Sequence, residues 1–315
     1  MSSAYIIRRV LTLVATLLIV AIVTFLVFEV IPGDPILTML GPDADPALVE
    51  LMRAEYGTDR PLPVRLATWF AGVVTGDLGM SIRFTRPVSS LIADRVVISL
   101  MIASLSVVII LVVAIPLGVF LAIRRRHWSE PIVSMGIQIG MAVPSFWLGI
   151  ILISVFGLML RMFPTGGFVA PSAGLMRSLN SVTLPAIAIS IPLIAVVVRY
   201  TRNSVIDQLS HDYVRTALSK GFPIRTVIYR HVLRNASLPV ITVLGMIFSN
   251  VVVGTIIIEQ VFALPGLGLL LVNAVSSRDF PLIQGLILYI TFAVAFFNLL
   301  VDLAYHVVDP RIELT

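Results

Sequence analysis

Long stretches without charge alternate with short polar segments along most of this chain. No charged residue falls between Arg95 and Arg124, and residues 131–160 are likewise uncharged. A hydrocarbon core of about 30 Å requires roughly 20 apolar residues per transmembrane helix. The pattern predicts six spans, at about residues 10–30, 97–123, 131–160, 182–199, 238–258 and 282–303. Helices are favoured over barrel strands because these runs lack alternating apolar and polar positions.

The composition supports an all-α membrane protein. Of the 315 residues, 58% are hydrophobic and 12% are charged, whereas soluble domains are about 25% charged. The net charge of +5 rests on arginine, since Lys220 is the only lysine. In a membrane protein this excess indicates topology and contact with lipid headgroups, and it does not indicate nucleic-acid binding. The absence of cysteine excludes disulfides and cysteine metal sites.

Arginines in the short loops predict the orientation. The cytoplasmic segments carry Arg8, Arg9, the cluster at 124–126 and the basic residues of 199–234. The short outer loops hold only Arg161, Arg177 and Arg278. Basic loops stay inside, so both termini are expected in the cytoplasm. The apolar run after Arg9 is long for a signal peptide and lacks a small-residue cleavage site, so it is interpreted as a retained first span.

Three parts follow from this pattern. Residues 1–30 form the cytoplasmic N-terminus and first span, residues 31–95 an ordered extracytoplasmic cap, and residues 96–315 a core of five spans. The core includes a cytoplasmic loop at 200–237, predicted as two short helices. The first covers 207–219 and is broken by Gly221, and the second begins near Pro223. Its apolar face is expected to contain Ile224, Val227, Ile228 and His231.

Recognisable enzyme chemistry is missing. His127, His211, His231 and His306 lie in or beside predicted cytoplasmic loops, and no zinc-protease, nucleophile-elbow or paired-acid motif lies in a span. The only lysine does not fit a P-loop, so any ATP that drives this protein binds another subunit. The acidic and basic residues Glu29, Arg199, Glu259 and Asp302 lie near span ends, where snorkelling is cheap. Nearly uncharged spans argue against proton coupling.

Motifs along nearly the whole chain resemble one family. The cytoplasmic loop contains D-Y-V-R-T-A-L-S-K-G at 212–221 and R-H-V-L-R-N-A-S-L-P at 230–239. The first span ends in I-P-G-D-P at 31–35, and the cap contains D-R-P-L at 59–62 and G-D-L-G-M-S at 76–81. L-P-G-L-G at 264–268, R-D-F-P at 278–281, N-L-L-V-D at 298–302 and D-P-R at 309–311 complete the set. Together they resemble importer permeases of the ABC superfamily, in the dipeptide, oligopeptide and nickel group.

This resemblance implies a type I importer permease fold with five core helices, an N-terminal peripheral helix and an extracytoplasmic cap. The cytoplasmic loop would be the coupling helix that docks on an ATPase. Its implied contacts are Tyr213, Val214, Arg215, Thr216, Ala217, Lys220, Gly221, Arg225, Arg230 and His231. Arg215-Thr216-Ala217 replaces the family's usual Glu-Ala-Ala, so the resemblance does not supply an acidic contact. Alternatively, Gly221 simply ends a helix, and the arginines simply set topology.

Other candidate sites lie in the spans and outer loops. Gln138, Pro144, Ser249 and Asn250 are candidates for the translocation pathway, although polar residues also pair helices and Pro144, Pro185 and Pro192 can serve packing alone. By resemblance, Glu259, Leu264, Pro265, Gly266 and Gly268 belong to an outer gate, although Pro-Gly and Gly-x-Gly also form plain turns. Asp59, Arg60 and Asp77 are family-level candidates for contacts with a binding protein.

The resemblance implies a non-catalytic permease of a bacterial or archaeal cytoplasmic membrane. Its implied partners are a second homologous permease, two ATPase subunits that bind ATP and magnesium, and a solute-binding protein. No cofactor is expected on this chain. Short peptides are the favoured cargo, with nickel chelates, glutathione and opines as alternatives. A secondary transporter, a channel and a purely structural subunit remain alternatives, and they would not depend on a docking loop.

Overall fold

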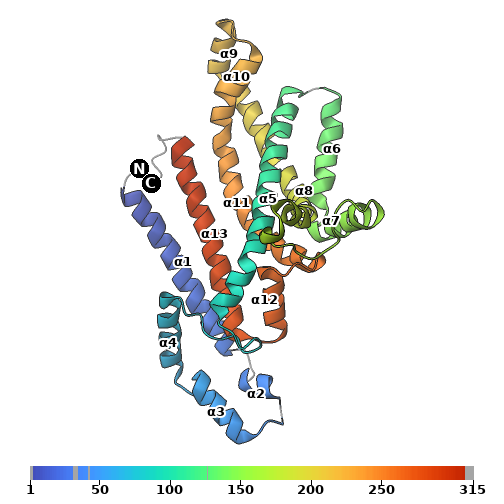
Figure 1. Cartoon of the computed structure of the whole chain (residues 1–315). Coiled ribbons are helices and arrows are strands. Elements are labelled where there is room, and N and C mark those ends of the chain that lie inside the picture. Colours follow the sequence, from blue (N-terminus) through green and yellow to red (C-terminus); the bar gives the residue numbers. More distant parts are fainter. Residues whose placement is uncertain (1–2, 31–34, 42, 126, 309–315) are drawn as a thin grey trace. The chain divides into compact units, whose positions relative to one another are not determined.

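The computed structural model describes residues 3–30, 35–41, 43–125 and 127–308 (Figure 1). Within these ranges the regular secondary structure is helical, apart from an isolated antiparallel bridge between Met80 and Pro87. The helices are α1 Ser3–Val30, α2 Pro35–Leu40, α3 Pro46–Tyr56, α4 Leu62–Thr75, α5 Val88–Ile123, α6 Ser129–Ala142, α7 Ser145–Leu152, η1 Ile153–Met159, η2 Pro171–Ala173, α8 Leu175–Leu209, α9 Asp212–Ser219, α10 Ile224–Val227, η3 Ile228–Val232, α11 Leu233–Val261, α12 Leu267–Ser276 and α13 Phe280–Val308. The I-P-G-D motif at 31–34 and the D-P-R motif at 309–311 lie outside the described residues.

Helices long and apolar enough to cross a membrane match the predicted spans. In the described part of the chain, five pass this test singly: Ile7–Glu29, Val88–Ile123, Leu175–Leu209, Pro239–Val261 and Phe280–Leu303. A sixth span is obtained if the bent pair α6 and α7–η1 is counted as one. The prediction of an all-helical chain with about six spans is therefore confirmed at this level.

The third predicted span is not one straight helix. The segments Glu130–Ala142 and Ser145–Met159 meet at an angle of 101°. Pro144 lies at this break, immediately before the first residue of α7, so it interrupts the helical path of this bent span and is not enclosed within a helix. The ring of Pro144 disfavours helical geometry at the preceding residue, and Val143 is indeed extended, with ψ of 126°.

The described residues form two compact units. One contains residues 100–264 and the C-terminal segment from 296, and the other contains residues 3–99 and 265–295. In the first unit α8 packs against α6, α7 and α11, while Pro185 and Pro192 lie within α8 as expected. A Cβ built on Gly118 would lie 2.6 Å from Thr201 Cβ, so α5 and α8 cross very closely at this point.

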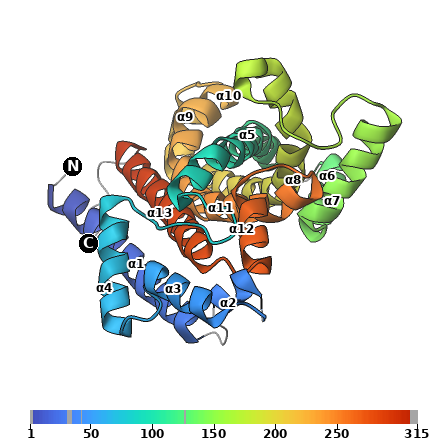
Figure 2. The same ribbon diagram turned by 60° about the horizontal axis from the view of Figure 1, so that its bottom comes forward.

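The second unit is built around the beginnings of α5 and α13 and the whole of α12. Its buried cluster contains Val88, Leu91, Ile92, Leu267, Leu270, Ala274, Leu282, Ile283 and Leu286. A Cβ built on Gly285 would lie 2.5 Å from Val88 Cγ1, which shows that only glycine permits this approach. Figure 2 shows α4 beside α1 in the same unit. The short helices α2 and α3, which precede α4 in the chain, contact each other. Residues 35–75 thus contain three short helices, with α4 placed against the first span.

Candidate functional site

The segment at 200–237 lies at the end of α8 and α11, and α9 and α10 form its extremity (Figure 1). Helix α8 continues to Leu209, ten residues past the predicted end of its span. At a rise of about 1.5 Å per residue, these residues carry the chain roughly 15 Å further along the helix axis. We call residues 210–232, which include α9, α10 and η3, the helical tip.

The first helix of the tip is shorter than predicted. It begins at Asp212 and not at residue 207, because α8 extends to Leu209 and the chain turns at Ser210 and His211. Ser210 Oγ donates to Asp207 O at 2.7 Å, and His211 Nδ1 lies 3.0 Å from the same carbonyl. His211 is extended, with ψ of 151°, so the new helix starts in a different direction.

Gly221 ends this helix in the left-handed conformation, with φ of +83°. The Phe222 N–H donates to Ala217 O at 3.3 Å, and the Gly221 N–H donates to Leu218 O at 2.9 Å. This pair of bonds is the Schellman motif, which favours glycine at the left-handed position. A Cβ on Gly221 would have no neighbour within 4 Å in this chain. Glycine is therefore required here by the backbone and not by crowding.

The second helix of the tip is not a separate element. Pro223 precedes it in an extended conformation, and α10, η3 and α11 run on continuously from Ile224 to Val261. Residues 228–232 form a π-helical turn, which shifts the buried stripe by one position. Val227, Ile228 and Val232 are buried, whereas Ile224 and His231 are exposed, so the predicted apolar face was partly wrong.

Buried side chains hold the tip on the ends of the long helices. Val214, which is 3% exposed, lies in a cluster with Val119, Ala122, Val205, Val227, Ile228, Val232 and Ala236. Ala217 and Tyr213 pack against this cluster, and the Tyr213 hydroxyl donates to Gln208 Oε1 at 2.9 Å. Val214 is thus a support of the tip within this chain, because its side chain is not available to another protein.

The exposed surface of the tip combines positive charge with apolar side chains. Arg215, Thr216, Lys220, Gly221, Arg225, Arg230 and His231 are exposed, as docking residues must be. The docking candidates did not include Leu218, Phe222, Ile224 and Tyr229, which are 42%, 46%, 47% and 67% exposed. Apolar residues flanking Gly221 in a polar loop were the available signal. This surface is suited to binding a protein groove that is partly apolar and partly acidic.

The pathway candidates come from separate helices. Gln138 is exposed on α6, and Asn250 is exposed on α11 beside the half-buried Ser249. The Asn250 side-chain amide donates to Met246 O at 2.9 Å, a bond within its own helix. Pro144 is exposed at the bend between α6 and α7. Asn250 and Gln138 therefore present polar groups at the surface of this chain.

The candidates for an outer gate are Glu259 and the L-P-G-L-G motif at 264–268. The beginning of this segment forms the turn that ends α11. The Leu264 N–H donates to Glu259 O at 2.8 Å, and Ala263 is left-handed, with φ of 49°. This turn is again of the Schellman type, but alanine stands where glycine is favoured. Leu264 and Glu259 are both buried. The expectation that Glu259 snorkels at a span end was therefore wrong, since Glu259 is fully buried.

The second part of that motif begins α12. Pro265 O accepts a hydrogen bond from Arg95 Nη1 at 3.4 Å, and the Leu267 N–H donates to Ser99 Oγ at 2.9 Å. Gly266 and Gly268 are buried beside these contacts. The segment is therefore more than a plain turn, because it is bonded to the beginning of α5.

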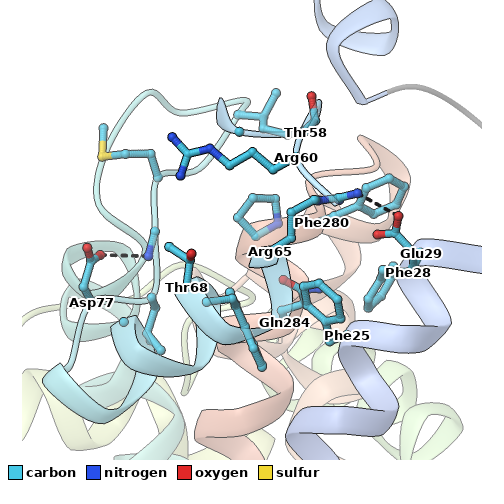
Figure 3. Close-up of a pocket in the computed structure, with 18 of the residues that line it drawn as sticks. Phe25, Phe28, Glu29, Thr58, Arg60, Arg65, Thr68, Asp77, Phe280 and Gln284 are labelled. Atoms are coloured by element: carbon cyan, nitrogen blue, oxygen red, sulfur yellow. Dashed lines mark hydrogen bonds and ion pairs between the residues drawn. The ribbon is translucent and has the colours of Figure 1, made fainter. Parts of the chain in front are cut away.

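A cavity of about 540 Å³ lies among α1, α4, the 77–82 loop and the beginning of α13 (Figure 3). Arg60 and Asp77 line it, whereas Asp59 is exposed outside it. Arg65 Nη1 and Glu29 Oε1 form an ion pair of 2.7 Å in its wall. The structure thus brings Arg60 and Asp77 to one pocket and leaves Asp59 on the outer surface.

Asp279 joins two motifs that are far apart in the sequence. This buried carboxylate accepts hydrogen bonds from the Ser81 hydroxyl and from the backbone N–H groups of Ile82 and Arg83. It also accepts from the Leu282 N–H and thereby caps the first turn of α13. The sequence analysis quoted both motifs and assigned Asp279 no role, because alternation and hydropathy carry no information about such long-range bonds.

Comparison with known proteins identifies the kind of component to which these features belong. Residues 114–314 match the family of binding-protein-dependent transport system inner membrane components, and residues 2–103 match the N-terminal region of such components. A Brucella melitensis protein, named as a peptide transport system permease, is 40% identical over 313 residues, 99% of each chain. The oligopeptide transport system permease AppB of Bacillus subtilis is 38% identical over 314 residues, also 99% of each chain.

The membrane helices, the motifs and the matched regions agree. Members of this family are non-catalytic transmembrane subunits that work with a binding protein and an ABC ATPase. The helices long enough to cross a membrane are those that such a multi-pass subunit requires. This chain belongs to the family of inner membrane components of binding-protein-dependent transport systems.

Proposed function

We propose that this chain is the permease through which an ATP-driven importer carries short peptides across the inner membrane. The relatives from B. melitensis and B. subtilis are named for peptide and oligopeptide transport, and each is similar over nearly its whole length. A pathway lined by uncharged side chains suits peptides, whose backbones need hydrogen-bonding groups more than a fixed charge. Gln138, Ser249 and Asn250 supply such groups, and the bend at Pro144 gives the pathway a non-helical wall.

The helical tip is the proposed coupling element, and its exposed surface carries this proposal. Leu218, Phe222 and Ile224 expose apolar area at the extremity of α8 and α11, and covering this area with a partner protein would be favourable. The surrounding arginines and Lys220 add charge complementarity to an acidic groove. ATP-driven closure of the ATPase would pull on this surface and change the access of the pathway from one side to the other.

The remaining parts follow from this assignment. The proposed fold is that of a type I importer permease, in which residues 1–30 include a peripheral helix, 31–95 form an outer cap and 96–315 form the core. Both termini face the cytoplasm. A second homologous permease completes the pathway, two ATPase subunits bind the two tips, and Glu259, Leu264, Pro265, Gly266 and Gly268 form the outer gate. Asp59, Arg60 and Asp77 contribute to the surface that receives the binding protein.

Reconstitution tests this proposal directly. The chain is co-purified with its second permease and ATPase subunits, inserted into vesicles and supplied with its binding protein. Uptake of labelled di- to pentapeptides is then compared with uptake of a nickel chelate, glutathione and an opine. The expected result is peptide uptake that requires ATP on the ATPase side and continues after ion gradients are collapsed.

Each of three results would contradict a part of this proposal. Uptake that persists without ATP and follows an imposed ion gradient would establish a secondary carrier or channel. ATP-dependent uptake of a non-peptide cargo, with peptides neither transported nor competing, would keep the importer assignment and refute the substrate. Recovery of the chain without ATPase subunits from a membrane that contains them would contradict the role of the tip.

A further inference from the structure

The cavity beside α1 has an apolar part and a cationic part. Phe25, Phe28, Trp69 and Phe280 supply aromatic walls, and Arg60 supplies a guanidinium group. In Figure 3 Arg60 lies on one side of the cavity, and Phe25 and Phe28 lie on the other. The volume of about 540 Å³ is within the range of small-ligand pockets. This division suits an amphiphile with an anionic head and an apolar tail.

The position of the cavity along α1 places it at the surface of the bilayer. The apolar span of α1 covers Ile7–Glu29, and the cavity is lined by Phe25, Phe28 and Glu29 from its last turns. These residues lie where the helix leaves the hydrocarbon core, whichever leaflet is concerned. Aromatic side chains are enriched at this depth because their rings tolerate both apolar and polar surroundings.

Helix α4 forms the side of the cavity and exposes apolar surface of its own. It is 14 residues long and has no buried residue, and Val64 and Val74 are 46% and 76% exposed. It is nevertheless fixed to α1, because the Phe25 and Trp69 rings lie 5.6 Å apart and Arg65 pairs with Glu29. A short apolar helix held beside the end of a span is expected to lie in the membrane interface. The cavity between α1 and α4 is then reached from lipid.

Arg60 is the cation left available for a ligand in this cavity. Arg65 is already paired with Glu29 at 2.7 Å, and the Asp77 carboxylate accepts from the Gly79 N–H at 2.9 Å. Within the described part of the chain, the Arg60 side chain has neither an ion pair nor a hydrogen bond. A guanidinium group recognises phosphate with paired hydrogen bonds, which a phosphodiester headgroup can accept.

We propose that the cavity binds one membrane glycerophospholipid, with its phosphate on Arg60 and the upper part of an acyl chain along Phe25, Phe28 and Trp69. The bound lipid fills the space between α1 and α4 and ties α4 to the first span. With a lipid bound, Arg60 is occupied by the phosphate, so of the three residues proposed above for the binding-protein surface Asp59 is the one that stays exposed outside the cavity. The proposal does not depend on the identity of the transported cargo.

Photolabelling in vesicles tests this site. The permease complex is reconstituted into phosphatidylethanolamine and phosphatidylglycerol vesicles that contain a phospholipid with a photoreactive group high on one acyl chain. After illumination and proteolysis, the fragments of the permease that carry the lipid label are identified by mass spectrometry. We expect strong labelling of residues around Phe25, Phe28 and Trp69. We expect Arg60→Gln to lower this labelling by roughly three- to tenfold, since hydrogen bonds to charged groups are among the stronger ones.

Arg83→Gln is the matched control, because Arg83 is an exposed arginine of the same unit and does not line the cavity. It should leave the labelling unchanged, as should an excess of water-soluble glycerophosphate. Equal labelling in wild type and Arg60→Gln, or label spread along α1 and α4 without preference, would mean annular lipid only and would overturn the proposal. Displacement by glycerophosphate would identify a soluble phosphate ligand instead.

Discussion

Glycine can be needed at the end of α9 for two reasons: a side chain would strain the left-handed backbone, or it would collide with a docked ATPase. Substitutions of Gly221 distinguish between them. The residue is left-handed, with φ of +83°, and a Cβ there would have no neighbour within 4 Å. In the isolated chain, alanine therefore costs only backbone strain, about 1–2 kcal/mol. Asparagine costs less, because it tolerates this conformation better than alanine does. Tryptophan bears the same strain as alanine, since its ring extends into open space.

This comparison tests the proposed contact between Gly221 and the ATPase. The strain is present in the free and the docked tip alike, so Gly221→Ala and Gly221→Asn should lower thermal stability and leave coupling near the wild-type level. Gly221→Trp should lower stability no more than Gly221→Ala does. It should nevertheless abolish substrate-stimulated ATP hydrolysis, because its ring occupies the space of the docking partner.

The assay measures melting temperature of the purified permease and ATP hydrolysis of the reconstituted complex, with and without binding protein and cargo. The decisive comparison is between Gly221→Ala and Gly221→Trp, which should have equal melting temperatures and differ in substrate-stimulated ATP hydrolysis. The reasoning is refuted if Gly221→Trp couples normally, since the ATPase would then not approach this residue. It is refuted equally if Gly221→Ala uncouples as completely as Gly221→Trp, since strain alone would then explain the requirement for glycine.

Further outcomes are expected from residues that act through packing and hydrogen bonds. Val214→Ala should leave a cavity that destabilises the tip by about 1–3 kcal/mol, and it should reduce the amount of ATPase that co-purifies. The control is Thr216→Ala on the exposed side of α9, which should change both quantities by little. Equal retention of the ATPase in the two variants would contradict the supporting role of Val214. Asp279→Asn should accelerate hydrogen exchange at the Ile82 and Arg83 amides by at least roughly tenfold, since charge-assisted hydrogen bonds contribute about 1.5–3 kcal/mol each. The control is Asp94→Asn, which removes one partner of an exposed ion pair. Unchanged exchange in Asp279→Asn would refute the assigned bonds. Ala263→Gly should raise thermal stability by about 0.5–1.5 kcal/mol, because glycine removes left-handed strain at an exposed position; a lower melting temperature would show that the turn is not strained.

Hydropathy predicted where helices cross the membrane and did not predict where they end. Residues 88–96 and 200–209 are helical but too polar to register as apolar runs, so α5 and α8 are longer than their predicted spans. Proline was equally ambiguous. Pro185 and Pro192 remain inside α8, whereas Pro144 separates α6 from α7. Neighbouring helices decide whether a lost backbone bond is tolerated, and that information is not local to the proline.

Motifs located the candidate sites, but burial decided what each residue can do. The tip residues were identified together, yet Val214 is interior and the exposed apolar residues Leu218 and Phe222 were not selected. A π-helical turn at 228–232 moves side chains relative to a regular helix, so periodicity placed His231 on the wrong face. The bonds that Asp279 accepts from the Ser81 hydroxyl and from the Ile82 and Arg83 N–H groups join residues almost 200 positions apart, where no spacing rule applies.

The helical tip is held in place by one set of residues, the buried cluster beneath it, and it presents a different set on its exposed surface. Val119, Val205 and Ala236 belong to the long helices α5, α8 and α11 and fix the tip without contributing to its outer face. Substitutions at the exposed positions can therefore accumulate without refolding the loop. If the tip docks on an ATPase as proposed, a few surface side chains can alter the preference for one ATPase over another while the supporting cluster stays unchanged.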